Sequence, residues 1–161
     1  MPKLRDRRED VTGVSAEPTR ARPVVLATMS VRVDPSAERM ALDSALEADV
    51  PLVIVNLLPL RPYPTTFGLF GHQGLTLPHE EDLDAVRATA ERAATLGVKT
   101  ELLRVTSRRP VPALMEVVRE RDAGLLVFGP DLRLTGRLRF RVTAMRVRRE
   151  ADCLVWIAPD G

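Results

Sequence analysis

Short apolar runs alternate with amphipathic segments along most of the chain, a pattern typical of a parallel sheet covered by helices. Five such runs are expected to be strands: residues 24–27, 52–58, 100–105, 125–128 and 153–157. Apolar residues recur at helical spacing between them, which predicts helices over 34–49, 79–96 and 110–121 and in an arginine-rich segment before the last strand. Because strands alternate with helices, we predict right-handed crossovers and an α/β fold: a three-layer open sandwich with a five-stranded parallel sheet.

Local signals mark several helix boundaries. Asp34 can cap the first helix, and Pro35 suits its first position. Gly97 is a natural C-cap for the second helix. In the arginine-rich helix one apolar face repeats at i, i+4 and i+7, and we expect it to pack on the sheet. That face consists of Leu138, Val142 and Met145.

Two stretches depart from the pattern. Residues 1–22 are charged and lack apolar periodicity, so we interpret them as a mobile tail before a single domain over residues 23–159. Residues 59–78 form a long irregular connection, of a kind that is often functional. No apolar run is long enough to cross a bilayer, and the N-terminus lacks the apolar core of a secretory signal, so we expect a cytoplasmic protein without a membrane partner.

Composition and the isolated reactive residues argue against several kinds of function. The net charge is only +2 over 161 residues, which is weak for a nucleic-acid binder. The single cysteine, Cys153, allows no intrachain disulfide and suits a reducing compartment. His72 and His79 have no partner at metal-ligand spacing, and the chain has neither a Walker loop nor a nucleophile elbow. The sequence therefore predicts no metal site and shows no catalytic constellation.

Two stretches of this chain resemble the universal stress protein family. The segment ELLRVTSRRPVPALMEVVRERDAGLLVFG is similar to the family's third strand, following helix and fourth strand. The segment READCLVWIA is similar to its fifth strand, with Leu154 where proline is usual. The likeness runs from Pro23 to Pro159. It implies a flavodoxin-like, adenine nucleotide alpha hydrolase-like sheet of order 3-2-1-4-5 and a cytoplasmic binding or regulatory module of the stress response, without catalysis.

Nucleotide-binding members of that family carry Gly-x-x-Gly, about nine residues, and then Gly-Ser or Gly-Thr, so that backbone amides reach the phosphates at a helix N-terminus. Gly129 matches the first glycine, but Leu132 stands at the second and Arg141-Val142 at the Gly-Ser position. Gly136 is present but out of register.

The family's aspartate after the first strand is also missing, since Thr28 and Met29 begin that turn. These departures resemble the members that do not bind ATP. The resemblance leaves one alternative open: a nucleotide binder or weak ATPase that uses the turn after residues 125–128, with ATP, AMP or another nucleotide as ligand.

Three arginines suggest a second hypothesis, which does not depend on the family resemblance. Arg137, Arg139 and Arg141 lie near a predicted helix start, where cations are unfavourable without an anion, and guanidinium groups fork well onto phosphate. A phosphate-bearing small molecule could therefore be held by side chains. The patch lacks interleaved aromatic residues, which argues against nucleic acid. The candidate binding set is Thr28, Met29, Gly129, Gly136, Arg137, Arg139 and Arg141.

The last strand suggests a partner. Proteins similar to this one commonly pair through that strand, and Val155, Trp156 and Ile157 form an apolar edge here. We therefore expect a homodimer through this edge.

Overall fold

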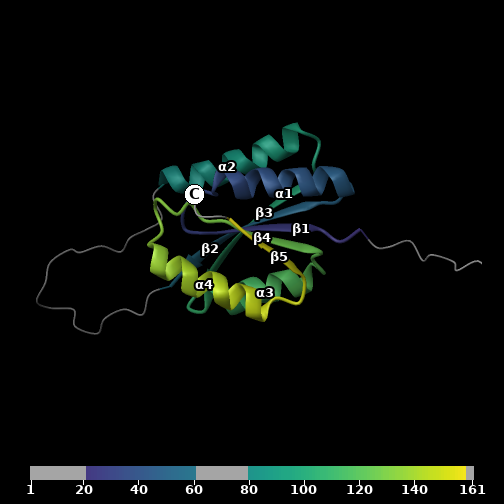
Figure 1. Cartoon of the computed structure of the whole chain (residues 1–161). Helices are drawn as coiled ribbons and strands as arrows, with labels where there is room; N and C mark the ends of the chain where they lie inside the picture. Colours follow the sequence, from purple (N-terminus) through teal and green to yellow (C-terminus); the bar gives the residue numbers. More distant parts are fainter. Residues whose placement is uncertain (1–20, 61–79, 159–161) are drawn as a thin grey trace, which may run out of the picture.

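The computed structural model describes residues 21–60 and 80–158, which form a three-layer α/β sandwich (Figure 1). The predicted tail and the long connection lie almost wholly outside these residues. The strands are β1 (Val24–Met29), β2 (Leu52–Pro59), β3 (Thr100–Ser107), β4 (Leu125–Phe128) and β5 (Leu154–Ile157). The helices are α1 (Pro35–Ala48), α2 (Glu80–Thr95), α3 (Pro110–Glu120) and α4 (Arg137–Glu150).

The strands pair in the order β3-β2-β1-β4-β5, and every pairing is parallel. This confirms the predicted sheet. Helices α1 and α2 cover one face, and α3 and α4 cover the other (Figure 1). Strand β1 lies at the centre, and the chain leaves it toward β2 on one side and reaches β4 on the other. The carboxyl ends of β1 and β4 therefore form the topological switch point of the sheet.

Buried side chains form one apolar cluster on each face. Under α1 and α2 the cluster includes Leu26, Ile54 and Val86. Under α3 and α4 it includes Leu114 and Phe128. Strand β1 is buried from Val24 to Thr28 because helices cover both faces of the sheet. This burial explains why the strand begins as a continuous run of apolar residues. Helix α3 buries one apolar face, which includes Val111, Leu114, Val117 and Val118.

Two predicted helix boundaries are confirmed. The Asp34 carboxylate accepts a hydrogen bond from the Ser36 amide at 2.8 Å and caps α1, with Pro35 at the first turn. After α2, Gly97 has a φ of +86°, a left-handed conformation that glycine adopts without strain.

The predicted inner face of α4 is wrong. Leu138, Val142 and Met145 are 78%, 51% and 69% exposed. The buried residues of α4 are instead Phe140, Ala144 and Val147. Both sets have the spacing i, i+4 and i+7, so the helix carries two apolar stripes on opposite sides.

Phe140 explains which stripe of α4 packs on the sheet. Its ring stacks on Phe128 at the end of β4, with centroids 5.9 Å apart and planes inclined by 13°. Aromatic pairs bury much more area than the aliphatic residues of the other stripe. The small side chain of Ala144 lets the helix approach the sheet one turn later.

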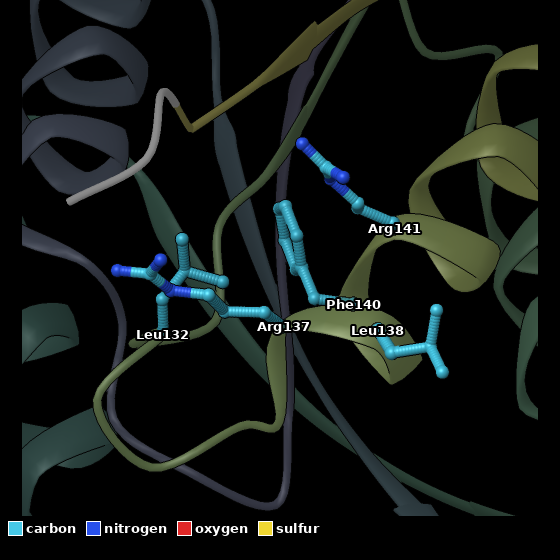
Figure 2. A pocket seen from close by; sticks show the side chains of 5 residues that line it. All are labelled: Leu132, Arg137, Leu138, Phe140 and Arg141. Carbon is cyan, nitrogen blue, oxygen red and sulfur yellow. The ribbon is translucent and has the colours of Figure 1, made fainter.

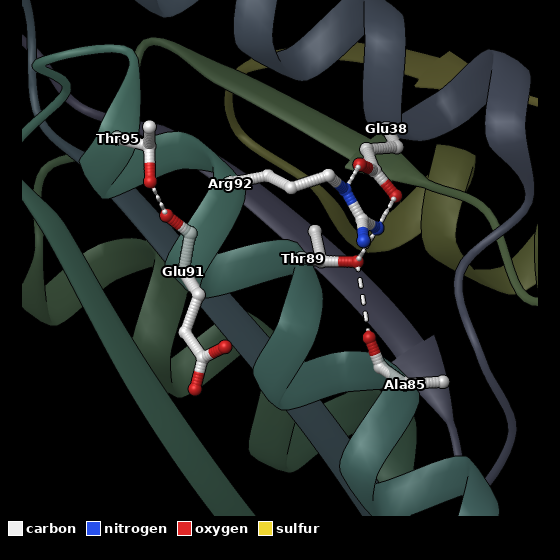
Figure 3. Close-up of polar contacts among 6 residues, drawn as sticks. All are labelled: Glu38, Ala85, Thr89, Glu91, Arg92 and Thr95. Atoms are coloured by element: carbon white, nitrogen blue, oxygen red, sulfur yellow. Dashed lines mark hydrogen bonds and ion pairs between the residues drawn. The ribbon is translucent and has the colours of Figure 1, made fainter.

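A charged pair joins α1 to α2 (Figure 3). Arg92 donates from Nε to Glu38 Oε1 at 2.7 Å and from Nη2 to Glu38 Oε2 at 2.8 Å, and the Thr89 hydroxyl donates to Oε2 at 3.0 Å. Burial raises the pKa of Glu38, but the hydrogen bonds from Arg92 and Thr89 and the charge of Arg92 outweigh it, so the pKa lies below 4.5.

Candidate functional site

The candidate site lies where β1 and β4 end, because ligands of open α/β sheets collect at the switch point. Two loops cover this edge. Residues 30–34 lead from β1 to α1, and residues 129–136 lead from β4 to α4. The geometry of these loops decides which groups a ligand could reach.

Backbone hydrogen bonds tie the two loops to each other. The Asp34 amide donates to the Gly129 carbonyl at 2.9 Å, and the Asp131 amide donates to the Arg32 carbonyl at 3.0 Å. Val33 and Pro130 form an antiparallel bridge between them. The amides of Asp34 and Asp131 are therefore not free to bind a phosphate in the crevice between β1 and β4.

Asp131 places a carboxylate in the same loop. It is 9% exposed, its Oδ1 accepts from the Arg133 amide at 3.0 Å, and its Oδ2 pairs with Arg32 Nε at 3.1 Å. A loop amide that could bind an anion is thus already occupied by an anion of the protein itself. An incoming phosphate would also meet the negative charge of Asp131.

Three of the predicted site residues serve the packing of this edge. Thr28 is fully buried, and its hydroxyl donates to the Val31 carbonyl at 2.6 Å. Met29 is partly buried against the cluster under α3 and α4. A Cβ atom built on Gly129 would overlap the Cβ of Ala37, so this glycine lets α1 pass close to the end of β4. None of the three lines the pocket described next.

A pocket of about 270 Å³ lies beside this edge, between the loop after β4 and the first turns of α4. It is lined by Leu132, Arg137, Leu138, Phe140 and Arg141. Figure 2 shows Leu132 and Arg137 on one side of the Phe140 ring and Arg141 on the other, with Leu138 directed away from them. The structure thus brings two of the three predicted arginines together around one pocket.

The start of α4 is electropositive. Arg137 and Arg141 form no ion pair with any described residue. The N-cap, Gly136, makes no side-chain hydrogen bond, and the first turn holds no acidic residue. The helix dipole and both guanidinium groups therefore act in the same direction and favour an anion here.

Two more of the predicted residues, in addition to Thr28, Met29 and Gly129, do not line the pocket. Arg139 is absent from its lining, since it lies roughly 200° around the helix from Arg137 at 100° per residue. Gly136 is exposed and does not line the pocket either. Sequence reasoning in turn missed Leu132, Leu138 and Phe140 as lining residues. The i, i+4 spacing of Arg137 and Arg141 was a usable signal for separating them from Arg139.

Other chemistry is sparse in the part of the chain that the structure describes. That part contains no group of three or more His, Cys, Asp or Glu side chains able to hold a metal ion. It contains no helix that is long and apolar enough to span a membrane. Burial raises the pKa of the Cys153 thiol, which disfavours the reactive thiolate.

Comparisons with known proteins identify the fold. A universal stress family protein from Burkholderia pseudomallei superposes with a TM-score of 0.64 at 23% identity, over 88% of this chain and 99% of that one. A universal stress protein from Archaeoglobus fulgidus gives a TM-score of 0.55 at 25% identity, over 84% and 97%.

Two further structures hold ligands. A universal stress protein from Archaeoglobus fulgidus in complex with dAMP gives a TM-score of 0.54 at 22% identity, over 84% of this chain and 96% of that one. A universal stress protein in complex with cAMP gives 0.56 at 21%, over 87% and 98%.

Sequence comparison gives a consistent result. None of the curated proteins compared with the chain matches it. The sequence model of the Universal stress protein family, however, matches residues 21–159, which is most of the chain. This protein therefore belongs to the universal stress protein family.

Proposed function

We propose that this protein is a non-catalytic cytoplasmic binding module whose ligand carries a phosphate group. The observation that carries the proposal is the pocket beside α4, in which Arg137 and Arg141 flank Phe140 without an ion-pair partner among the described residues (Figure 2). Two guanidinium groups one helical turn apart can each donate paired hydrogen bonds to phosphate oxygens.

The rest of the lining suits a ligand with an uncharged part. Leu132 and Leu138 contribute apolar surface, and the Phe140 edge lies between the two arginines. Nucleotides combine a phosphate with a flat base, and universal stress proteins with bound dAMP and cAMP share this fold. We therefore take a nucleotide as the first candidate ligand.

The mode of binding would differ from a glycine-rich phosphate loop. Here the Asp131 amide bonds to the loop after β1, and the Arg133 amide bonds to the Asp131 carboxylate. Arginine side chains, rather than backbone amides, would hold the phosphate. This supports a ligand site that lies beside α4 and outside the crevice between β1 and β4.

The lining also supports a binding role over an ATPase. The pocket residues are two leucines, two arginines and one phenylalanine. None of these side chains can accept a proton from an attacking water, which general base catalysis of hydrolysis would require.

Isothermal titration calorimetry with ATP, AMP, cAMP, a cyclic dinucleotide and inorganic phosphate tests the proposal. Binding of at least one ligand is expected, with affinity about tenfold lower or worse in Arg137→Gln/Arg141→Gln, since a hydrogen bond to a charged group contributes about 1.5–3 kcal/mol. Arg148→Gln is the matched control: Arg148 lies on the same side of α4 but outside the pocket. No heat with any ligand, or equal losses in both variants, would exclude the site.

We also propose that the protein is a homodimer through the outer edge of β5. This strand ends the sheet, so its outer backbone groups pair with no other described strand. Leu154 is 75% exposed there, and Val155, Trp156 and Ile157 are only partly buried. A second β5 could pair with this edge and cover these side chains. Light scattering coupled to size exclusion should give twice the monomer mass of 17.8 kDa, and a monomer at all concentrations would exclude this dimer.

A further inference from the structure

The outer face of α4 carries an apolar stripe that nothing in the described structure covers. Leu138, Val142 and Met145 are all more than half exposed and repeat over two turns. At 100° per residue they lie roughly opposite the buried stripe of Phe140, Ala144 and Val147, so they point away from the sheet. Exposed apolar residues that gather in this way typically mark an interaction surface.

Arginines line both sides of this stripe. Helical spacing places Arg141 and Arg148, with Arg137, along one side, and Arg139 and Arg146 along the other. Only Arg146 has an ion-pair partner among the described residues, Glu150 at 3.4 Å. The surface is therefore an apolar ridge between two rows of positive charge.

We propose that this face of α4 docks an acidic amphipathic helix of a partner protein. A helix with apolar residues at i, i+3 or i+4 and i+7 would pack along the stripe, which rises about 10.5 Å from Leu138 to Met145 at 1.5 Å per residue. Asp and Glu beside those apolar residues would meet the arginines on each side, as charges flank the seam of a coiled coil.

The charge of the neighbouring helix α3 favours a single helix over a membrane surface as the partner. Helix α3 covers the same face of the sheet as α4 (Figure 1), and its exposed residues include Glu116 and Glu120. An anionic membrane pressed on this face would meet those carboxylates. A single helix lying along α4 would not need to contact them.

The charge of α4 also argues against self-association through this face. Symmetric pairing of two copies would place the arginines of one α4 against those of the other. Duplex nucleic acid would match the charge, but it would leave Val142 and Met145 without an apolar contact. An acidic helix is the occupant that satisfies both features.

The test is an unbiased peptide selection on the full chain. Phage-displayed 20-residue peptides are selected on the wild type and counter-selected on Val142→Glu/Met145→Glu, since neither residue lines the pocket. Enriched peptides should combine acidic residues with apolar residues at helical spacing. Synthetic versions should bind by fluorescence anisotropy, at least about tenfold more weakly to the variant, because the ridge provides the apolar contact.

Matched variants separate this face from the rest of the surface. Leu46→Glu/Leu96→Glu makes the same kind of change at exposed residues of α1 and the end of α2, and it should leave peptide binding unchanged. Arg139→Gln/Arg148→Gln removes one unpaired charge from each side and should weaken binding and reduce its salt dependence. Amide shifts in NMR spectra should centre on α4.

Four results would overturn the proposal. The first is a selection whose peptides lack acidic residues or bind the Glu variant equally well. The second is co-sedimentation with phosphatidylserine vesicles that requires Val142 and Met145, which would make this face a membrane surface. The third is self-association that the same variant abolishes. The fourth is binding to duplex DNA that the same variant abolishes.

Discussion

Gly129→Ala is the substitution whose effect follows most directly from the structure. The added Cβ would overlap the Cβ of Ala37 on α1 and approach the Cβ of Ala158 to 3.4 Å. Neither neighbour has a flexible end that can move aside, so α1 or the end of β4 must shift. Overpacking of a buried site costs about 1–3 kcal/mol, which for a domain of this size lowers Tm by roughly 2–12 °C.

A double-mutant cycle isolates the contact. Ala37→Gly removes the overlapped methyl group and by itself should cost about 1 kcal/mol in helix propensity. Combined with Gly129→Ala, it should relieve the overlap. The free energy of unfolding lost in the double variant should therefore be about 1 kcal/mol less than the sum of the losses in the two single variants. Gly136→Ala is the control, because a Cβ there meets no atom within 4 Å and should change stability by less than about 0.5 kcal/mol.

Thermal unfolding and titration of the same proteins decide between two roles for Gly129. If its role is close packing, Gly129→Ala lowers the Tm but keeps the ligand affinity measured well below that temperature. If its backbone instead holds phosphate, affinity falls while the Tm stays unchanged. The second result, or strict additivity in the cycle, would refute the packing argument.

Four further substitutions test other contacts by chemical or thermal unfolding. Glu38→Gln should cost about 1 kcal/mol at pH 7. Since the folded pKa of Glu38 is lowered, this difference should persist above about pH 5 and vanish as the pH falls through that pKa; a pH-independent difference would contradict it. Phe140→Ala should cost about 3 kcal/mol and Met145→Ala less than about 0.5, and the reverse order would mean that the other stripe packs on the sheet. Asp131→Asn should cost about 1 kcal/mol through its pair with Arg32, and unchanged stability would show that this pair does not hold the loops together.

The sheet could be predicted because its signals are local. Each strand is a short apolar run, and the caps at Asp34 and Gly97 depend on a few neighbouring residues. Helix α3 has a single apolar stripe, so its spacing alone indicates which face packs on the sheet. Strand order followed from the family resemblance and not from periodicity.

The face of α4 could not be predicted from spacing alone. Its two stripes have the same period, so the hydrophobic pattern fits either orientation. The choice depends on Phe128, which lies in another element and stacks on Phe140. Side-chain size was the available signal, because the stripe that packs holds the only aromatic residue of the helix.

The site could be predicted only in part, because its decisive contacts also lie between different elements. The sequence placed Gly129 at the right turn, but it does not show that the missing Cβ would point at α1. It also gave no reason to single out Asp131, whose importance depends on contacts with Arg32 and with the Arg133 amide. The arginines were identifiable because unpaired cations at a helix start are unfavourable on their own.

Under the proposed function, the departures from the family's glycine motif and the arginine pocket have one explanation. Backbone amides can hold a phosphate only while they are free, and after β4 the Asp131 amide bonds to the neighbouring loop while the Arg133 amide bonds to the Asp131 carboxylate. The Asp131 carboxylate would also repel a phosphate from that crevice. Two arginines that form no ion pair with a described residue, Arg137 and Arg141, line the pocket beside the same loop. A chain that binds phosphate without those glycines would need such side chains there, which is why the arginine variants, rather than glycine variants, are the decisive test of the proposed function.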